Sequence, residues 1–365
     1  MRTLTQTRTT SASTSALIES LEARELLASA THRVLAQINF VADPTGTAVR
    51  HDADLVNPWG LAFGTASGFW VANNGSGKAT AFDANGVTQS TVVTLPTAGT
   101  EPNSTPTGVV ANTGAGFQLS NGSAAQFIYV GEDGLITGSN AASGTSALVA
   151  VDNSAGGSIY KGVTIGQING ADALFAADFH NGKIDVFDST FKPMTLTTGA
   201  FTDSQVPAGF APFNVQNLGG KIYVTYAKQD AAKEDDVPGA GNGFVDVFDT
   251  SGTVLTRFSH ASRLDSPWGL EIAPAGFGKY SGDVLVGQFG SGEILAFDAT
   301  TGNFQSILRG KHDHRVRIDG LWSLKFGNGT TSGSAKSLFF TAGTNGEAGG
   351  LFGRLKLTTE KVAKA

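Results

Sequence analysis

The chain repeats itself at intervals of about fifty residues, and this period restricts its fold more than any other feature. The clearest repeated element is a Trp-Gly-Leu start at Trp59 and Trp268, with a related start at Trp322. With three weaker copies included, the equivalent positions of the six starts are Trp59, Thr107, Lys161, Phe213, Trp268 and Trp322. The steps between these positions are 48, 54, 52, 55 and 54 residues.

Each unit has the pattern of a group of short strands. A β-rich apolar run follows each start, and in four units a Phe-Asp element comes after it. These elements lie at residues 82–83, 187–188, 248–249 and 297–298. Three of them lead into Gly86, Gly252 and Gly302, as a turn requires. Each unit therefore holds four short strands separated by Gly, Asn and Asp turns.

Four strands per unit at this period are typical of the blades of a β-propeller, and six starts indicate six blades. A solenoid would need shorter units, and an array of sandwiches would need more strands per domain. The sequence therefore predicts an all-β fold, a six-bladed β-propeller with four antiparallel strands per blade.

The two ends of the repeat region predict how the ring closes. Residues 34–41 alternate like a strand but precede the first start, and the last unit ends after its third strand at residues 351–357. We expect the N-terminal strand to become the outer strand of the last blade, which leaves no open ring. An independent edge strand would leave that blade incomplete. The expected division is a targeting-like segment over residues 1–32, the propeller over 33–358 and a tail over 359–365.

The composition fits stacked sheets and excludes several functions. Only 15% of the residues are charged, while Gly contributes 48 residues and Phe 24. Strand faces that pack on neighbouring sheets leave little room for charge, so we expect most Phe, and the Trp of the starts, to pack between blades. A net charge of −6 argues against nucleic-acid binding, and no apolar run is long enough to span a membrane. The absence of cysteine removes disulfides, thiolate nucleophiles and Cys-type zinc sites.

The first thirty residues allow two interpretations. Residues 15–30 can form a short amphipathic helix that frays at the N-terminus. Residues 20–27 also resemble the LExRxLL motif near the N-terminus of many exported planctomycete proteins, and residues 28–30 would suit a cleavage site. The apolar run of an ordinary signal peptide is missing. We expect an exported bacterial protein that is extracellular or lies at the cell surface.

The repeated motifs resemble those of NHL-type six-bladed propellers. The resemblance is nearest to an uncharacterised family of exported bacterial propellers, some with a PEP-type C-terminal sorting signal. The stretches that carry it are residues 57–61, 241–249 and 319–322, and it covers about residues 33–357. Residues 357–365 hold no sorting signal, so anchoring by that route is doubtful. The resemblance implies the fold and no activity.

The expected topology indicates where a site would lie. The loops that enter the first strands, and those between second and third strands, meet at one face of the propeller, here called the upper face. We expect polar side chains in these loops to converge on the axis and to bind a ligand. The candidates are Asn57, Asn73, Glu132, Asp178, His180, Tyr226, Gln288 and Asp319.

Two functions remain open at this point. One is a secreted binding or surface-interaction module for a small molecule, a glycan or a protein, expected as a monomer. The other is an enzyme with a divalent cation at the channel mouth, a lactonase-like hydrolase or a lyase. Asn73, Glu132, Asp178 and Asp319 offer oxygen ligands for a hard cation such as calcium, although turns need the same residue types. A set of three or more cation-coordinating residues near the axis would favour the enzyme. An aromatic-lined or plugged mouth would favour the binding module.

Two loops carry further charge. Residues 312–314 have the sequence His-Asp-His, which could supply two metal ligands but is more typical of a solvated loop. The long insertion at residues 229–242 lacks the ligand order of an EF-hand. Its place between the second and third strands of the fourth unit predicts that it lies over the upper mouth. It could act there as a flap or a weak calcium site.

Overall fold

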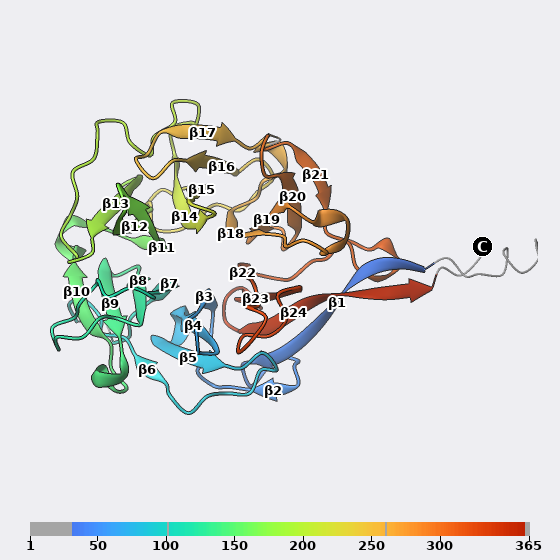
Figure 1. The fold of residues 1–365 in the computed structure, drawn as a ribbon, viewed down its shortest axis with the longest axis horizontal. Helices are drawn as coiled ribbons and strands as arrows, with labels where there is room; N and C mark the ends of the chain where they lie inside the picture. The colour runs from blue at the N-terminus through green and yellow to red at the C-terminus, as the bar shows by residue number, and fades with distance from the viewer. Residues whose placement is uncertain (1–30, 101, 260, 362–365) are drawn as a thin grey trace, which may run out of the picture.

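A computed structural model describes residues 31–100, 102–259 and 261–361, in six sheets arranged around a central axis (Figure 1). The six-bladed β-propeller expected from the sequence is confirmed. The expected targeting-like segment falls almost wholly outside the described residues, as do the last residues of the expected tail.

The strands follow the repeat in chain order. Blade one holds β3 (Pro58–Phe63), β4 (Phe69–Asn73), β5 (Lys78–Phe82) and β6 (Val93–Thr94). Blade two holds β7 (Pro106–Ala111), β8 (Phe127–Gly131), β9 (Leu135–Ser139) and β10 (Leu148–Asp152). Blade three holds β11 (Tyr160–Ile168), β12 (Ala171–Asp178) and β13 (Lys183–Asp188). Blade four holds β14 (Phe210–Leu218), β15 (Lys221–Lys228), β16 (Gly243–Phe248) and β17 (Val254–Arg257).

Blade five holds β18 (Pro267–Ile272), β19 (Asp283–Gln288), β20 (Ile294–Asp298) and β21 (Phe304–Ile307). Blade six holds β22 (Leu321–Phe326), β23 (Ser337–Ala342), β24 (Leu351–Lys361), β1 (Thr31–Ala42) and the short β2 (Arg50–His51). Two blades differ from the expected four strands. The sheet of blade three has three strands, and that of blade six has five.

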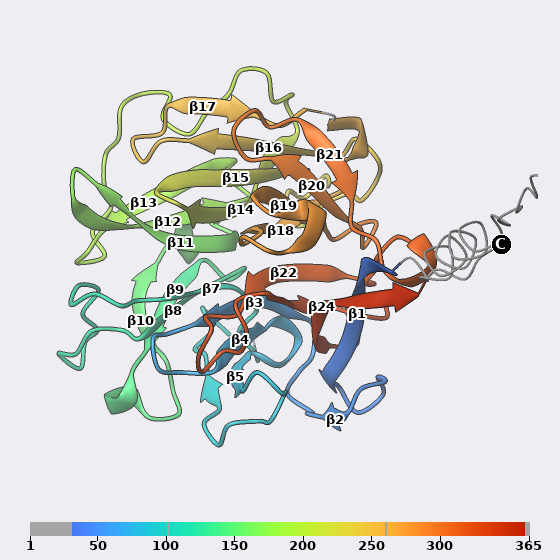
Figure 2. The same cartoon turned by 45° about the vertical axis from the view of Figure 1, so that its right-hand side comes forward.

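The ring closes as the sequence predicts. The N-terminal strand β1 pairs with the C-terminal strand β24 along its whole length, from Thr31 opposite Lys361 to Ala42 opposite Leu351 (Figure 2). The two ends of the described chain therefore hold one blade together. Breaking this pairing would expose the edge of β24 and open the ring.

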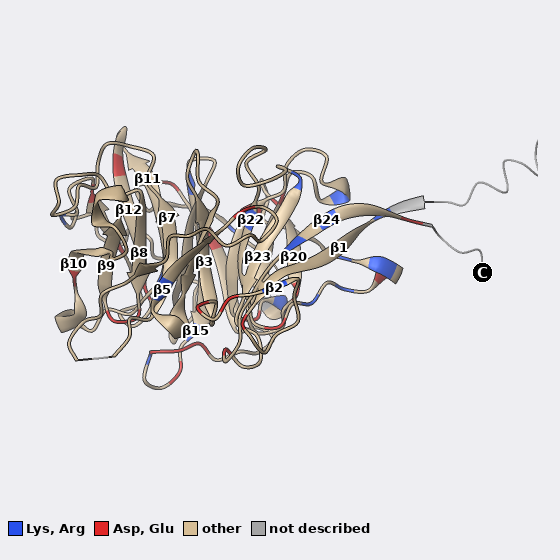
Figure 3. Cartoon of the chain, turned by 90° about the horizontal axis from the view of Figure 1, so that it is seen from below, with Lys and Arg blue, Asp and Glu red and all other residues tan. Residues whose placement is uncertain are grey.

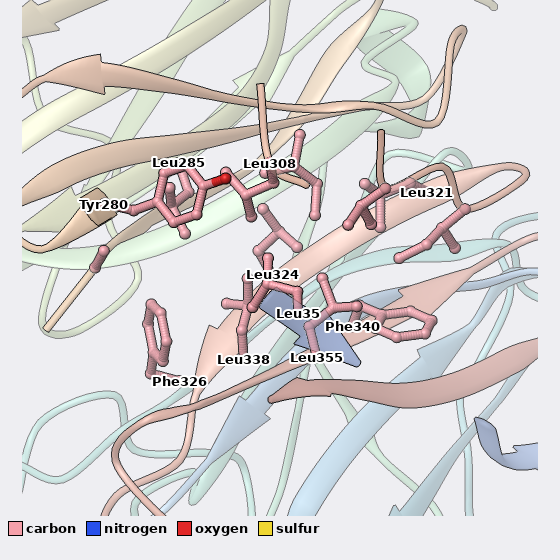
Figure 4. Packing of buried hydrophobic residues seen from close by; sticks show 14 of the residues in the cluster. Leu35, Tyr280, Leu285, Leu308, Leu321, Leu324, Phe326, Leu338, Phe340 and Leu355 are labelled. Atoms are coloured by element: carbon pink, nitrogen blue, oxygen red, sulfur yellow. The ribbon is translucent and has the colours of Figure 1, made fainter. Parts of the chain in front are cut away.

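Apolar clusters fill the spaces between the blades. Between blades five and six, Leu285 and Ile294 pack with Leu324, Phe340 and other side chains, all buried (Figure 4). Leu35 of β1 belongs to the same cluster, so the closing strand is held by packing as well as by backbone hydrogen bonds.

The Phe-Asp elements form turns, as expected. In blade four, the Asp249 carboxylate accepts hydrogen bonds from the backbone N–H groups of Ser251 and Thr253, each at 2.9 Å. Gly252 between them has a φ of 91°, which glycine adopts without steric cost. The aspartate thus caps its own turn, which explains why Asp follows Phe in four units.

Every first strand contains a bulge beside the position equivalent to Trp59. The register shifts between Pro267 and Gly269 in blade five, and at the equivalent place in the other five blades. In four of the six blades the residue after the equivalent position is a glycine that touches the next blade. A Cβ at Gly269 would lie 2.6 Å from the carbonyl oxygen of Trp322, and one at Gly60 would lie 2.7 Å from that of Thr107. Glycine therefore lets the first strands approach one another around the axis.

We expect Gly269→Ala to lower the free energy of unfolding by about 1–3 kcal/mol, because the new methyl group meets backbone that cannot move freely. The matched control is Gly156→Ala, where a Cβ would have nothing within 4 Å. Urea unfolding of both variants measures the difference. Equal midpoints for the two variants would contradict the close approach of the strands.

Candidate functional site

Aromatic side chains fill the axis of the propeller. Trp59, Phe213, Trp268 and Trp322 come from four first strands and are almost fully buried in one cluster. The rings of Trp59 and Trp322 stack with centroids 3.4 Å apart, and Trp268 meets Trp59 edge-on at 6.1 Å. Phe289 stacks on the other side of Trp322 at 4.0 Å. We call this cluster the aromatic plug. The three Trp therefore pack on one another at the axis rather than only between blades.

The backbone that enters the three Trp-bearing strands has an unusual conformation. Two residues before each Trp, φ is positive: 45° at Asn57, 46° at Ser266 and 62° at Gly320. Asn and Ser adopt this region only at a cost, and such residues cluster at functional sites. The side chain of Asn57 lies against the plug, where its Oδ1 accepts a hydrogen bond from Trp322 Nε1 at 3.0 Å.

Lys161 is the charged member of the ring of equivalent positions. Its side chain is 1% exposed, and its ammonium donates to Glu132 and to Asp235 at 3.2 Å. The same ammonium lies 5.2 Å from the ring centroid of Trp59 and 5.8 Å from that of Phe179. Burial disfavours the charged form of Lys161, but the two carboxylates outweigh burial and raise its pKa. The lysine is therefore a charged group held between carboxylates and aromatic faces.

Further polar side chains extend this arrangement across the mouth. Asn74 donates to Glu132 at 2.8 Å, and Asn57 donates to Asn74 at 3.4 Å and to Glu347 at 2.7 Å. Burial raises the pKa of Glu347, and the nearby Glu132 raises it further. We call Lys161, Glu132, Asn74, Asn57, Glu347, Asp235 and Asp236 the axial network.

Asp236 is the carboxyl of the network with the largest change in acidity. Burial raises its pKa to about 6, against the opposing effects of the Ser266 hydroxyl and Lys161. Its Oδ2 is buried and accepts no hydrogen bond. Because Asp236 holds its proton more tightly in the folded state, its ionisation opposes folding.

We expect Asp236→Asn to stabilise the protein by about 1–3 kcal/mol above pH 7 and to have little effect near pH 4, because each pKa unit corresponds to about 1.4 kcal/mol. Well below pH 4 the carboxyl is protonated in both the folded and the unfolded state. As the pH rises from about 4 to about 6, the carboxyl ionises in the unfolded state but keeps its proton in the folded state, so the cost to folding grows and then stays constant above pH 6. The amide removes this cost. Thermal unfolding from pH 4 to pH 8 measures the effect, with Glu234→Gln in the same loop as control. A pH-independent shift in Tm would contradict the assignment.

A pocket of about 470 Å³ lies beside the axial network. Its walls are Thr97, Asn103, Thr105, Glu132, Asp133, Ile159, Glu234 and Asp235. Four of these eight residues are carboxylates, and the insertion at residues 229–242 supplies two of them. The insertion therefore reaches the mouth, as expected from its place in the repeat. Figure 3 shows acidic residues along the edge of the molecule where β15 leads into this loop.

The structure brings two of the eight sequence-predicted site residues together. Asn57 and Glu132 both belong to the axial network, joined through Asn74. Asn73, next to Asn74, is instead buried within blade one, where it donates to Thr80 Oγ1 at 3.0 Å.

The other predicted residues make separate contacts. Asp178 accepts hydrogen bonds from Ile159 and Asn181, which shape a turn. Gln288 bonds the backbone of Asp265 and Arg263 in the same blade. Asp319 accepts from the backbone of Asn345 at 2.9 Å. Tyr226 is buried among apolar side chains, and burial, followed by Asp246, raises its pKa well above the usual value. The Nδ1 atom of His180 is buried without a hydrogen bond.

The expected cation ligands are thus not gathered at one point. In the described part of the chain, no group of three or more His, Cys, Asp or Glu side chains could hold a metal ion. His312 and His314 lie on an exposed loop, with His312 Nδ1 3.3 Å from Glu360. Within the same residues, no helix is long and apolar enough to cross a bilayer.

Known structures with the same architecture have very different sequences. A structural-genomics protein of unknown function from Bacteroides thetaiotaomicron aligns with 90% of this chain and 77% of its own length, with a TM-score of 0.57 and 11% identity. A streptogramin B lyase aligns with 89% of this chain and 98% of its own length, with a TM-score of 0.51 and 11% identity. At these identities the similarity shows the fold alone.

Sequence relatives come from a virus. No protein-family model matches the chain. An uncharacterised protein of Acanthamoeba polyphaga mimivirus is 30% identical over 330 residues, which cover 87% of this chain and 80% of the viral protein. A second uncharacterised protein of the same virus is 30% identical over 276 residues, which cover 72% of this chain and 71% of the viral protein. These relatives give no support to the expected bacterial family with sorting signals. The chain belongs to the same family as these uncharacterised mimivirus proteins.

Proposed function

We propose that the protein is a binding module whose upper mouth takes an organic cation, an ammonium or guanidinium compound. The observation that supports this most directly is the state of Lys161. The chain's own ammonium sits between two carboxylates and the faces of Trp59 and Phe179. Carboxylates combined with aromatic faces are the usual means by which proteins recognise such cations.

The charge balance of the mouth leaves room for a second cation. Glu132 and Asp235 contact the single ammonium of Lys161, and Asp236 and Glu347 interact with it electrostatically. Burial is the main cause of the raised pKa values of Asp236 and Glu347, and neighbouring carboxylates raise both values further. A bound cation would relieve the same repulsion that protonation relieves at low pH.

The pocket has the size and walls for a small ligand of this kind. Its volume of about 470 Å³ falls in the range typical of small-molecule sites. Glu234 and Asp235 lie on the exposed insertion, so they can close on a ligand with little disturbance of the blades. The aromatic plug fills the axis, so no open channel passes through it. A plugged mouth is what we expected of a binding module. No contact among the described residues favours the alternative of a hydrolase or lyase with a divalent cation.

The test is a thermal-shift and tryptophan-fluorescence screen with spermidine, agmatine and choline, and with citrate and glycerol as anionic and neutral controls. We expect the cations to raise Tm in a saturable way that weakens with salt, because only the folded state binds them. The double variant Glu234→Gln/Asp235→Asn should weaken binding at least tenfold. Asp313→Asn removes an exposed carboxylate elsewhere and should leave binding unchanged. An equal response from the double variant, or from citrate, would refute the proposal.

Export and the monomeric state belong to the same proposal. Residues 20–30 support export through their likeness to the LExRxLL motif and a cleavage site. Fractionation of cells that express the full chain, or a chain lacking residues 1–30, tests this. Only the full chain should leave the cytoplasm, and equal distribution would contradict export. Light scattering of the purified protein should give the mass of one chain.

A further inference from the structure

Blade three has an uncovered outer edge. Its sheet ends at β13, whereas in blades one, two, four and five a fourth strand covers the equivalent edge. After β13 the chain starts to form the same hairpin. Asp188 N–H donates to the carbonyl of Lys192 at 2.9 Å, and Met194 N–H donates to that of Val186 at 2.8 Å. The pairing stops there, so residues Lys183 to Asp185 have no outer neighbour strand.

The unpaired backbone group can be identified from the repeat. Backbone groups of alternate residues point to the same side of a strand, so Ile184 faces outward like Val186. The residues equivalent to Ile184 are Val245 and Ile294. Their carbonyls accept hydrogen bonds from Phe258 N–H and Leu308 N–H, both at 2.9 Å. The outward carbonyl and N–H of Ile184 have no such partner within the described residues.

The segment after Met194 leaves this edge and instead makes contacts with blade four. Phe201 N–H donates to the carbonyl of Gly252 at 2.9 Å. The Phe201 ring packs on Phe175 and Phe248, with centroids 5.7 and 5.3 Å away. A groove of about 860 Å³ remains beside β13. Its walls include Ile184, Val186, Phe187, Met194 and Leu196, together with Asp152, Asn153, Ala155, Gly156 and Ser158.

Two aspartates, Asp152 and Asp185, line this groove, and Asp185 indicates the charge of the side chain that would bind beside it. Asp185 is equivalent in the repeat to Asp246 of blade four. Asp246 is bonded by Arg257 Nε at 3.1 Å, and Arg257 belongs to the fourth strand of that blade. Asp185 instead contacts the half-exposed Lys183 of its own strand at 2.7 Å and accepts from Tyr160 at 2.8 Å. The position that Arg257 fills in blade four is empty of chain in blade three.

We propose that this edge binds an extended segment of a partner polypeptide, which becomes the fourth strand of blade three. The segment carries an arginine opposite Asp185, followed by a large apolar residue whose N–H donates to the Ile184 carbonyl. Arg257 and Phe258 show this pair in place in blade four. Addition of a strand to an open edge supplies affinity through the main chain and specificity through alternate side chains. The site is separate from the axial network.

The test uses a fluorescent peptide with the sequence of residues 253–259, Thr-Val-Leu-Thr-Arg-Phe-Ser, and the full-length protein. Anisotropy should show saturable binding. A peptide with N-methyl phenylalanine cannot donate to Ile184 and should bind at least tenfold more weakly, as should a peptide with glutamate in place of arginine. Failure of the parent peptide to bind, or equal binding by the N-methyl peptide, would overturn the proposal.

Variants of the protein test the same site through its own residues. Asp185→Asn keeps a hydrogen-bond acceptor for Tyr160 and removes the charge. It should therefore weaken binding of the arginine peptide at least tenfold, while the Tm of the protein stays unchanged. Thr197→Trp, at an exposed wall of the groove, should block the peptide regardless of its charge. Asp313→Asn is the control and should bind the peptide like the parent chain. Unchanged binding by both Asp185→Asn and Thr197→Trp would place the peptide elsewhere and refute the site.

Discussion

Replacing Trp322 with alanine is expected to lower the free energy of unfolding by about 3–5 kcal/mol, the usual cost of removing a large buried aromatic side chain. Trp322 is fully buried, stacks between Trp59 and Phe289, and donates its Nε1 hydrogen to Asn57. The substitution opens a cavity on the axis and leaves Asn57 Oδ1 without its indole donor. Neighbouring first strands cannot close the gap, because their backbones are already in contact at the glycines.

The control for Trp322→Ala is Trp70→Ala. Trp70 is only partly buried and lies away from the axis. Its ring packs on that of Phe127, with centroids 5.1 Å apart. Its loss should cost clearly less. Urea unfolding followed by circular dichroism measures both variants. An equal loss of stability would show that the aromatic plug has no special role in holding the blades together.

Replacing Lys161 with methionine is expected to cost about 3 kcal/mol at pH 7, the lower end of the range for removing one partner of a buried ion pair. The lower end applies because Glu132 is 23% exposed and Asp235 is 74% exposed, so water can solvate part of the charge that is left. Methionine fills the space beside Trp59, and the loss therefore reports the charge rather than a cavity. The cost should shrink as the pH falls below 6, because Asp236 and Glu347, whose pKa values burial raises, take up protons and leave less negative charge uncompensated.

Lys183→Met is the matched control for Lys161→Met. Lys183 also contacts an aspartate, Asp185 at 2.7 Å, but its side chain is half exposed. Exposed pairs contribute little, so its loss should stay below about 1 kcal/mol. Denaturant unfolding at pH 4.5 and pH 7 gives both values. A cost for Lys161→Met that does not depend on pH would contradict its place among ionised carboxylates.

The fold could be predicted from the sequence because its causes are local and recur. Each Phe-Asp turn is capped by its own aspartate, and four of the six first strands place a glycine where the next blade approaches. The alternation of residues 34–41, together with a last unit that ends after its third strand, was enough to predict closure by β1. The missing strand of blade three was not predictable in the same way. It depends on the long-range contact of Phe201 with Gly252, while the local sequence after Asp188 still looks compatible with a strand.

The site was predicted only in part, for a similar reason. Topology places loop residues near the upper face, but local hydrogen bonds decide which side chains are available. Asp178 and Gln288 are held by their own turns, and the sequence alone does not show those contacts. The sequence did contain a signal for Lys161, because it stands where other blades have Trp, Phe or Thr. A charged residue at a position that reaches the axis needs carboxylate partners, and this reasoning would have linked Lys161 to Glu132, which was already a candidate at the upper face.

The binding proposal is tested most directly by calorimetric titration of spermidine at pH 6, in two buffers of different ionisation enthalpy. Because a bound cation favours the ionised forms of Asp236 and Glu347, binding should release protons at pH 6 and fewer at pH 8. We expect saturable heat whose size depends on the buffer at pH 6. Absence of saturable heat, or the same titration curve from the Glu234→Gln/Asp235→Asn variant, would contradict a cation site at the upper mouth.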